Sequence, residues 1–316
     1  MSQASKTFYY RYLFESRSLG EYLLERYFFR LNGLDLEVWI SERVRVNDRR
    51  VIGSYLLQYG DKIEYLHFRK DEDKLELDLK ILFEDEACLA ISKPSDLPVT
   101  PSGAYYFNSL AIMVKEKWQN DEISPVHRLD LETSGVLLFG KNRFTRKKIQ
   151  TQFQEHEIEK CYQAVVFNDP DGELIQGDLV SDDHSLIHSK LKLIDSAYPS
   201  SVTRILKKQP WGNYYRLWLS PITGKTNQIR AHLASIGCPI VGDKKYYPDE
   251  SIFLDWYRFR DINRILPKVK LNRQALHHES LSFIHPYTGD QLRIVDETLY
   301  WEESLATLLS SSEPKV

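Results

Sequence analysis

The sequence has little cysteine and no long hydrophobic run, and each absence excludes a class of protein. Its three cysteines, Cys88, Cys161 and Cys238, lie far apart without C-x-x-C spacing, and any disulfide scheme would leave one unpaired. We interpret them as reduced, packed thiols. No window approaches eighteen uncharged apolar residues, and the first residues lack the apolar segment of a signal peptide. We therefore expect a cytoplasmic protein with no membrane segment.

A strong net charge and the common cofactor motifs are also missing. The formal net charge is −3 at pH 7, so any affinity for nucleic acid must come from local patches. None of the motifs H-E-x-x-H, G-x-S-x-G and G-x-G-x-x-G occurs. The segment TGKT at 223–226 looks like the end of a phosphate loop, but the first glycine of that loop would fall on Leu219. A nucleotide triphosphatase is therefore not indicated.

Two local basic patches are present. The run KNRFTRKK from Lys141 to Lys148 carries five cationic side chains and no acid, and a second patch around a predicted turn consists of Arg43, Arg45, Arg49 and Arg50. Taken alone, each patch is typical of a solvated protein face. The patches become informative only beside a second indication that the protein binds RNA.

Changes in composition predict the domain boundaries. A charged run, DEDKLELD, begins at Asp71 and predicts a linker over residues 71–80, between an N-terminal module (1–70) and a larger domain (81–309). We expect that such a run can neither pack nor continue a sheet. The polar tail at 310–316 begins SSSEP, and we expect it to be disordered.

The N-terminal module has a recognisable order of elements. Apolar spacing predicts a helix at 18–31 and a second at 36–41, followed by a hairpin around Asn47-Asp48 and a last strand at 65–68. With its V-x-V-N-x-R turn and G-D-x-I finish, this α/β module resembles the small RNA-binding module named after ribosomal protein S-four. The resemblance implies that the four arginines of the second patch meet phosphates, because guanidinium groups match planar anions.

In the larger domain, apolar strands alternate with shorter helical stretches. Helices are predicted at 147–154 and 227–236. The β-rich segments are 81–83, 89–91, 136–139, 162–167, 215–219 and 281–283. This pattern predicts a mixed α+β domain around a largely antiparallel sheet.

The run HRLDLETSG at 127–135 has the layout of an active site. Asp130 stands between a cationic dipeptide and a tight polar turn, and the apolar run that follows at 136–140 is typical of a buried strand. The carboxylate would then lie on a rigid edge beside the core. In this position it can act as a nucleophile or as a base.

Two further polar positions stand at the edges of predicted elements. Tyr162, in the strand sequence EKCYQAVV, can face a site, although a packed core tyrosine is the alternative. Arg230 adjoins the apolar stripe of the helix at 227–236, which Thr226 can cap and Gly237 can end. A cation at the edge of the core needs an anionic partner, either an active-site acid or a surface acid.

Together these segments resemble the RluA-type pseudouridine synthases over most of residues 80–290. Four blocks carry the resemblance in the right order: ILFEDE leading to SKPSDLPV, HRLDLETSGVLL, the K-x-Y at Lys160, and TGKTNQIR with PIVGD. The nine-residue core of the second block is the most specific. Two positions depart from the family pattern: Asn227 stands where histidine is usual, and Asp96 stands where glycine is commoner. Both departures bear on the substrate surface more than on the reaction.

The resemblance implies an RNA pseudouridine synthase with Asp130 as nucleophile, Arg230 as its ion-pair partner and Tyr162 against the target uracil. The arginine would keep the carboxylate ionised and in one orientation. The family's reaction breaks the bond between uracil and ribose, turns the base and rejoins it through carbon. It needs no outside group, so we expect neither a metal nor a nucleotide or other cofactor. Whether the acid attacks the sugar or the base, or abstracts a sugar proton, stays open.

RNA is the expected partner, and a target in structured RNA must first be extruded from its stack. We expect Arg128 to occupy the vacated position; a salt bridge that holds its own loop is the alternative. The other substrate or RNA-binding candidates are His127, Thr133, Lys160, Ile229, Lys141, Arg143, Lys147 and Lys148.

Several alternatives stay open at this point. Large-subunit ribosomal RNA is the favoured target because the N-terminal module suits it, and transfer RNA is the second possibility. A catalytically silent RNA-binding factor for ribosome assembly would not need Asp130, Tyr162 and Arg230 together. A glycosidic hydrolase commonly uses two carboxylates, and the nearest second one, Glu132, lies at a variable position of the motif. The sequence does not determine the oligomeric state.

Overall fold

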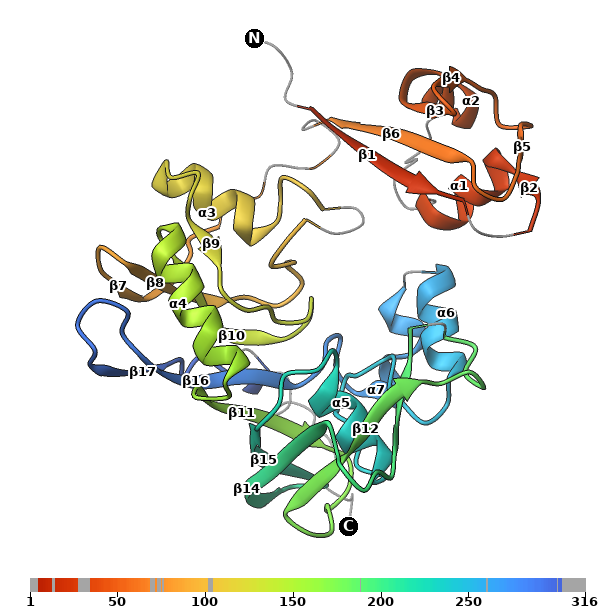
Figure 1. Ribbon diagram of the computed structural model, residues 1–316. Coiled ribbons are helices and arrows are strands. Elements are labelled where there is room, and N and C mark those ends of the chain that lie inside the picture. Colours follow the sequence, from red (N-terminus) through yellow and green to blue (C-terminus); the bar gives the residue numbers. More distant parts are fainter. Residues whose placement is uncertain are drawn as a thin grey trace. The chain divides into compact units, whose positions relative to one another are not determined.

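The computed structural model describes most of the chain and divides it into two compact units (Figure 1). One unit comprises Met1–Glu76 and Pro101–Ile112, and the other comprises Leu77–Thr100 and Met113–Val316. The described residues are 5–12, 15–27, 35–68, 72, 75, 77–101, 105–187, 189–259, 261–299 and 301–302. The tail predicted at 310–316 lies outside them. In this described part of the chain, no helix has the length and apolar composition needed to cross a membrane.

The first unit contains a four-stranded antiparallel sheet, a two-stranded ladder and two helices. Its elements are β1 (Ser5–Arg11), β2 (Arg17–Ser18), α1 (Leu19–Tyr27), α2 (Leu36–Arg43), β3 (Val44–Val46), β4 (Arg49–Arg50), β5 (Leu56–Leu57) and β6 (Lys62–Phe68). The sheet order is β1-β6-β3-β4. Its core includes Trp39, which stacks on Tyr65 with ring centroids 5.3 Å apart.

Local signals account for the elements of this unit. Ser18 Oγ accepts the Glu21 N–H and Glu21 Oε2 accepts the Ser18 N–H, both at 3.2 Å, which forms a capping box at the start of α1. Asn47 and Asp48 have positive φ, as the two-residue turn between β3 and β4 requires. The predicted helix at 18–31 is confirmed over Leu19–Tyr27, and its last four residues lie outside the described part of the chain. The second predicted helix and the hairpin are confirmed, whereas β1 was not predicted. The likeness to the ribosomal S-four module stays a prediction.

Glu72 corrects the expectation for the charged stretch. Its side chain is 9% exposed, and its carboxylate accepts backbone N–H groups at 2.7–3.1 Å from Tyr106, Phe107 and Asn108. Three N–H donors stabilise a carboxylate that would be costly to bury alone. The expectation that this stretch cannot pack is therefore wrong at Glu72. The domain boundaries at residues 70 and 80 stay predictions.

The second unit is built on an eleven-stranded mixed sheet, and β10 with β16 is the parallel pair among its described ladders. Its strands are β7 (Ile81–Glu84), β8 (Cys88–Lys93), β9 (Ser124–Pro125), β10 (Ser134–Gly140), β11 (Glu159–Val166), β12 (Leu174–Ser181), β13 (Leu191–Ile194), β14 (Ser201–Trp211), β15 (Tyr214–Pro221), β16 (Leu276–Ile284) and β17 (Gln291–Val295). The main order is β13-β12-β14-β15-β11-β16-β10-β8-β7, with β17 on β16 and β9 on β10. The predicted α+β class with a largely antiparallel sheet is confirmed.

Helices cover parts of this sheet. They are α3 (Leu110–Trp118), α4 (Arg143–Gln154), α5 (Gln228–Ser235), α6 (Ser251–Phe259), the 3-10 helix η3 (Ile262–Arg264) and α7 (Leu266–Val269). Helix α4 contacts β10 and β16, and α5 contacts β12, β13 and β14. The apolar stripe of α5 places Ile229 and Leu233 in a core with Leu217 and Leu219 of β15. This packing fixes where the residues at the start of α5 lie.

Central strand β10 is buried along its whole length, as expected for a continuous apolar run between two neighbouring strands. At its start, Gly135 has φ +112 and lies opposite His278 of β16. A Cβ at this glycine would lie 2.2 Å from the backbone oxygen of His278, so a larger residue would push the two strands apart. The close approach sets the position of β16 behind the loop that precedes β10.

The start of α5 differs from the prediction. Asn227, not Thr226, is the N-cap residue; it has φ 53 in the left-handed region and makes no side-chain cap bond. The Gln228 side chain instead accepts the Lys225 N–H at 3.0 Å and the Thr223 hydroxyl at 2.6 Å, which closes the turn before the helix. The side chain of the first helical residue therefore fixes the preceding turn, and the N-cap position falls on Asn227 instead of the predicted Thr226.

Candidate active site

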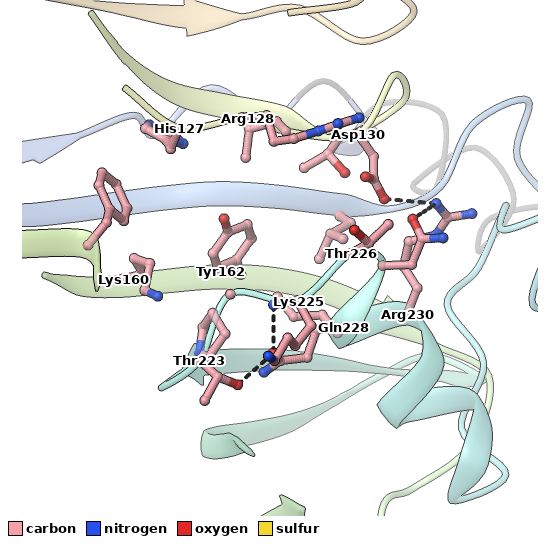
Figure 2. A pocket seen from close by; sticks show the side chains of 18 of the residues that line it. His127, Arg128, Asp130, Lys160, Tyr162, Thr223, Lys225, Thr226, Gln228 and Arg230 are labelled. Atoms are coloured by element: carbon pink, nitrogen blue, oxygen red, sulfur yellow. Dashed lines mark hydrogen bonds and ion pairs between the residues drawn. The ribbon is translucent and has the colours of Figure 1, made fainter. Parts of the chain in front are cut away.

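A cavity of about 310 Å³ opens in the second unit, where the loop before β10, strand β11 and the start of α5 meet (Figure 2). It is lined by Val126, His127, Arg128, Leu129, Asp130, Thr133, Phe153, Lys160, Tyr162, Pro221, residues 223–230 and Leu276. The three residues predicted to carry the reaction all lie on its wall. So do five of the predicted RNA-binding residues, namely His127, Arg128, Thr133, Lys160 and Ile229.

Asp130 and Arg230 form the ion pair that the sequence predicts. Arg230 Nη1 donates to Asp130 Oδ2 at 2.8 Å, and the Asp130 side chain remains 25% exposed. Figure 2 shows the carboxylate pointing from its loop toward the guanidinium at the start of α5. The pair joins residues one hundred positions apart in the chain. It holds the carboxylate in one orientation while leaving it accessible from the cavity.

Asp243, which the sequence did not single out, holds the other side of Arg230. Arg230 Nε donates to its Oδ2 at 2.7 Å and Nη2 donates to its Oδ1 at 3.0 Å, and the Asp243 side chain is fully buried. Burial alone would lower the pKa of Arg230, but the two carboxylates raise it well above its ordinary value. Arg230 also donates to Asn227 Oδ1 at 3.2 Å, and Asn227 Nδ2 donates to the Tyr246 hydroxyl at 3.4 Å. The arginine is therefore fixed from three sides.

Tyr162 lies on the cavity wall from strand β11 (Figure 2). Its ring stacks on the His278 ring, with centroids 4.4 Å apart and an interplanar angle of 16°. Burial and the nearby Asp130 charge raise the pKa of Tyr162, so the hydroxyl stays protonated at neutral pH. The tyrosine therefore presents a neutral aromatic face beside the carboxylate.

His127 is a neutral part of the wall. Burial lowers its pKa to about 3, and its Nε2 accepts the Leu138 N–H at 3.1 Å. Its ring lies 5.2 Å from that of Phe153. A neutral imidazole offers no cation to a phosphate, so a role for His127 in RNA binding would rest on packing or hydrogen bonding.

The other predicted residues at the cavity differ in what they can offer to RNA. Arg128 is exposed, and Lys160 is partly buried, which lowers its pKa to about 8. Thr133 is 2% exposed, and its Oγ1 accepts from Gln274 Nε2 at 2.6 Å. Ile229 is 7% exposed. The two cations can reach an anion, whereas the threonine and the isoleucine shape the wall.

The basic run of α4 is mostly free to meet solvent. Arg143, Lys147 and Lys148 are exposed, but Lys141 pairs with Glu84 at 2.6 Å and is 17% exposed. Three of the five cations in this run are therefore exposed, Lys141 is held in a salt bridge, and Arg146 donates to the backbone oxygen of Glu122.

The four arginines of the patch in the first unit differ in their exposure to solvent. Arg45, Arg49 and Arg50 are exposed. Arg43 is 8% exposed, with its guanidinium carbon 5.9 Å from the centre of the Trp39 ring. This burial corrects the expectation that Arg43 meets phosphates, because its side chain packs over the tryptophan at the end of α2.

Two lysines contact the loop that carries Asp130. Lys93 is fully buried and its Nζ donates to the carbonyls of Pro94, Leu131 and Thr133 at 2.8–2.9 Å. Lys244 Nζ donates to Glu132 Oε1 at 2.6 Å. Neither lysine was predicted from the sequence, since the loop that each supports is distant in the chain. The contacts of Lys93 set the shape of the turn that presents Asp130, whereas Lys244 holds the Glu132 side chain.

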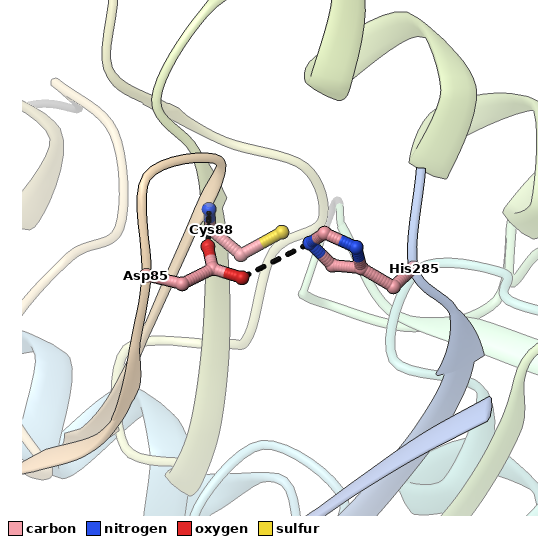
Figure 3. A group of neighbouring side chains, drawn as sticks. All are labelled: Asp85, Cys88 and His285. Atoms are coloured by element: carbon pink, nitrogen blue, oxygen red, sulfur yellow. Dashed lines mark hydrogen bonds and ion pairs between the residues drawn. The ribbon is translucent and has the colours of Figure 1, made fainter. Parts of the chain in front are cut away.

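Asp85, Cys88 and His285 form the group of potential metal ligands found among the described residues, with ligand atoms within 4.8 Å of one another (Figure 3). Asp85 Oδ1 accepts the N–H groups of Ala87 and Cys88 at 2.8 and 2.6 Å. His285 Nδ1 accepts the Thr288 N–H at 3.2 Å, which leaves the ring proton on Nε2, 3.0 Å from Asp85 Oδ2. Burial raises the pKa of Cys88 to about 12. These atoms fit an imidazole–carboxylate pair beside a protonated thiol, and we assign no metal here.

Comparisons with known proteins agree with this geometry. The sequence model of the RNA pseudouridylate synthase family matches residues 87–235. The dual-specificity RNA pseudouridine synthase RluA of Pasteurella multocida is 32% identical over 217 residues, which cover 68% of this chain and 90% of the relative. The chain belongs to the RluA-type RNA pseudouridine synthases. Ribosomal large subunit pseudouridine synthase C of Haemophilus influenzae is 30% identical, over 79% of this synthase and 78% of the relative.

Solved structures show the same fold. Human RNA pseudouridylate synthase domain containing 1 matches this synthase with a TM-score of 0.55 at 19% identity, over 77% of this chain and 98% of the human one. This likeness shows the pseudouridine synthase fold, and membership of the family makes the protein an RNA-modifying isomerase. Its cavity, with an acid, an arginine and a tyrosine on one wall, is the candidate active site.

Proposed function

We propose that this synthase isomerises uridines in large-subunit ribosomal RNA and that Asp130 is its nucleophile. One observation supports the role of Asp130: its carboxylate faces the cavity, 25% exposed, with one oxygen held by Arg230. A fixed carboxylate with access to substrate can attack or accept a proton without first reorganising. The ribosomal target is supported by the large-subunit enzyme that is 30% identical.

The reaction requires few protein groups besides this carboxylate and a cavity of suitable shape. The bond between N1 and C1′ breaks and a bond between C5 and C1′ forms, while a proton leaves C5 and one is gained at N1. Atoms and electrons balance within the nucleoside. Asp130 can attack the sugar, attack the base or take up a sugar proton. Each route needs a carboxylate held in one orientation, and Arg230 supplies the hydrogen bond that holds it.

Tyr162 is the proposed contact for the uracil ring. Its aromatic face lies in the cavity, and its hydroxyl is neutral at physiological pH. Stacking of a base on an aromatic side chain contributes about 1–3 kcal/mol and tolerates any rotation of the base in its plane. A contact of this kind suits a reaction in which the base must turn while it remains bound.

Cations around the cavity are the proposed contacts for the RNA backbone. Arg128 is exposed at the cavity and is placed to fill the stack that the flipped uridine leaves. Lys160 lines the cavity from β11. Arg143, Lys147 and Lys148 extend the basic surface along α4. In the first unit, Arg45, Arg49 and Arg50 are the proposed phosphate contacts.

The activity test uses the purified full chain and a large-subunit ribosomal RNA transcript labelled with tritium at C5 of uridine. We expect tritium release without added metal or nucleotide. Asp130→Asn should abolish release while RNA affinity stays within about twofold, because the amide keeps the size of the acid but cannot act as a nucleophile. Full activity of this variant would remove Asp130 from the mechanism, and release of free uracil would favour a hydrolase.

Transfer RNA is the second candidate target, since the relatives named dual-specificity synthases share about the same identity. Mapping pseudouridines across all RNAs in cells with and without the gene separates the two. Loss of sites in large-subunit ribosomal RNA alone supports the proposal. Loss of sites in transfer RNA alone would contradict it.

A further inference from the structure

His278 lies directly behind Tyr162 and is not part of the cavity wall. It sits in β16 opposite Tyr162 of β11, and its side chain is fully buried. The two rings stack at 4.4 Å with an interplanar angle of 16°. The face of Tyr162 that meets the cavity therefore has an imidazole on its other side.

This stack has consequences for how Tyr162 is held. No hydrogen bond to its hydroxyl occurs within the described part of the chain, so the orientation of the ring depends on what packs against it. The strand below it is irregular, because the pairing of β11 with β16 shifts register between Cys161 and Tyr162. The stacked imidazole then restrains the tilt of the ring, together with the apolar core against which Tyr162 packs.

His278 is itself fixed to the strand that follows the Asp130 loop. Its Nδ1 lies 2.7 Å from the backbone oxygen of Val136 in β10. A carbonyl oxygen only accepts, so Nδ1 carries the proton and donates. Burial and the neighbouring His127 lower the pKa of His278 well below its ordinary value, which keeps the ring neutral. The backbone of His278 lies directly against Gly135 in the parallel ladder of β10 and β16.

We propose that His278 is a positioning residue for the isomerisation: it sets the ring of Tyr162 in a fixed relation to β10, the strand that follows the Asp130 loop. One imidazole joins three strands, through its own backbone in β16, its hydrogen bond to β10 and its stack on β11. The inference rests on the proposed contact between Tyr162 and the uracil. A uracil held between Tyr162 and Asp130 then depends on His278, which never touches it.

The first test replaces the imidazole. His278→Ala removes both the stack and the bond to Val136, and we expect kcat to fall by about 10- to 100-fold with KM and RNA affinity within about twofold, because small misplacements of reacting groups are costly. His278→Phe keeps the ring and the volume, and should recover most of this loss. It also serves as the informative variant if the alanine protein does not fold.

A matched control lies next to it on the same strand. His277 is also fully buried, but it faces the other side of the sheet, where Nδ1 meets Ser134 Oγ at 2.9 Å and Nε2 meets the Asp296 carbonyl oxygen at 2.8 Å. His277→Ala should lower the melting temperature as much as His278→Ala and leave kcat within about threefold. Equal losses of kcat in the two variants would show a general effect of stability and would overturn the proposal.

A double-mutant cycle distinguishes the failure of this inference from the failure of the proposed function. If His278 acts through Tyr162, the double variant Tyr162→Leu/His278→Ala is no slower than Tyr162→Leu alone. Additive losses would show that His278 acts elsewhere and would overturn the positioning role. Full activity of Tyr162→Leu would instead remove Tyr162 from the site, whatever His278 does.

Discussion

Two acids lie two positions apart in one loop and each pairs with a cation, yet only one pair faces the cavity. Asp130 is 25% exposed and pairs with Arg230, whereas Glu132 is 17% exposed and pairs with Lys244, which is 4% exposed. Glu132 also accepts the Gln274 N–H at 3.0 Å, which ties it into the framework. The same kind of contact therefore presents one carboxylate to substrate and fastens the other to the fold.

The cations differ in their own partners. Arg230 is held by the buried carboxylate of Asp243, so its three-residue cluster with Asp130 carries one negative charge in excess. Lys244 has Glu132 as its acidic partner and donates its other described bond to the backbone oxygen of Asn272. A cation with a second acid can orient Asp130 without cancelling its charge. This is the property that separates a reactive pair from a structural one.

The sharpest test of the comparison removes each cation. Arg230→Met should lower kcat by at least about 100-fold, because Asp130 loses its orienting donor and the buried Asp243 loses its counter-charge. Lys244→Met should leave kcat within about threefold. Single-turnover kinetics on the ribosomal transcript measures both. Equal losses would mean that the two pairs share one role.

The second test removes an acid from each pair and measures stability by urea unfolding. Glu132→Gln leaves the Lys244 ammonium buried without a counter-charge and should cost about 3 kcal/mol. Asp130→Asn should cost less than about 1 kcal/mol, since the site is partly exposed and Arg230 keeps Asp243. The order of the two variants in stability is therefore opposite to their order in activity. A larger stability loss for Asp130→Asn would contradict the division.

The smallest expected effect is a dependence of RNA binding on pH. It concerns Lys160, a cation at the cavity that pairs with no acid among the described salt bridges. Burial lowers the pKa of Lys160 to about 8, so the side chain is charged below that pH and neutral above it. The KM for RNA should then rise by up to about fivefold between pH 7 and 9, the size of one exposed ion pair. Lys160→Arg stays charged throughout and should flatten the profile. An unchanged slope in this variant would assign the pH effect to another group.

The sequence alone could predict the reacting pair because both members lie in specific motifs at the edges of strong elements. It did not identify Asp243 as a partner of Arg230, since no sequence pattern indicates that the loop between α5 and α6 returns to the start of α5. It did not assign His278 to the site, because a histidine in a strand can face either side and the register with β11 decides which. Arg43 was misassigned for a related reason: a cation near a helix end can pack over Trp39 instead of facing solvent.

Two separate requirements limit which residue types can stand at the position of Asn227. Its backbone adopts the left-handed conformation, which few residues other than glycine accept readily, with asparagine, aspartate and histidine the best tolerated. Its side-chain oxygen also accepts from Arg230, which glycine could not offer. Few residue types are therefore acceptable at this position. Asparagine and the histidine that the family resemblance gives as usual here are both tolerated in this conformation. A sequence can therefore change from one to the other while the backbone of the turn stays the same.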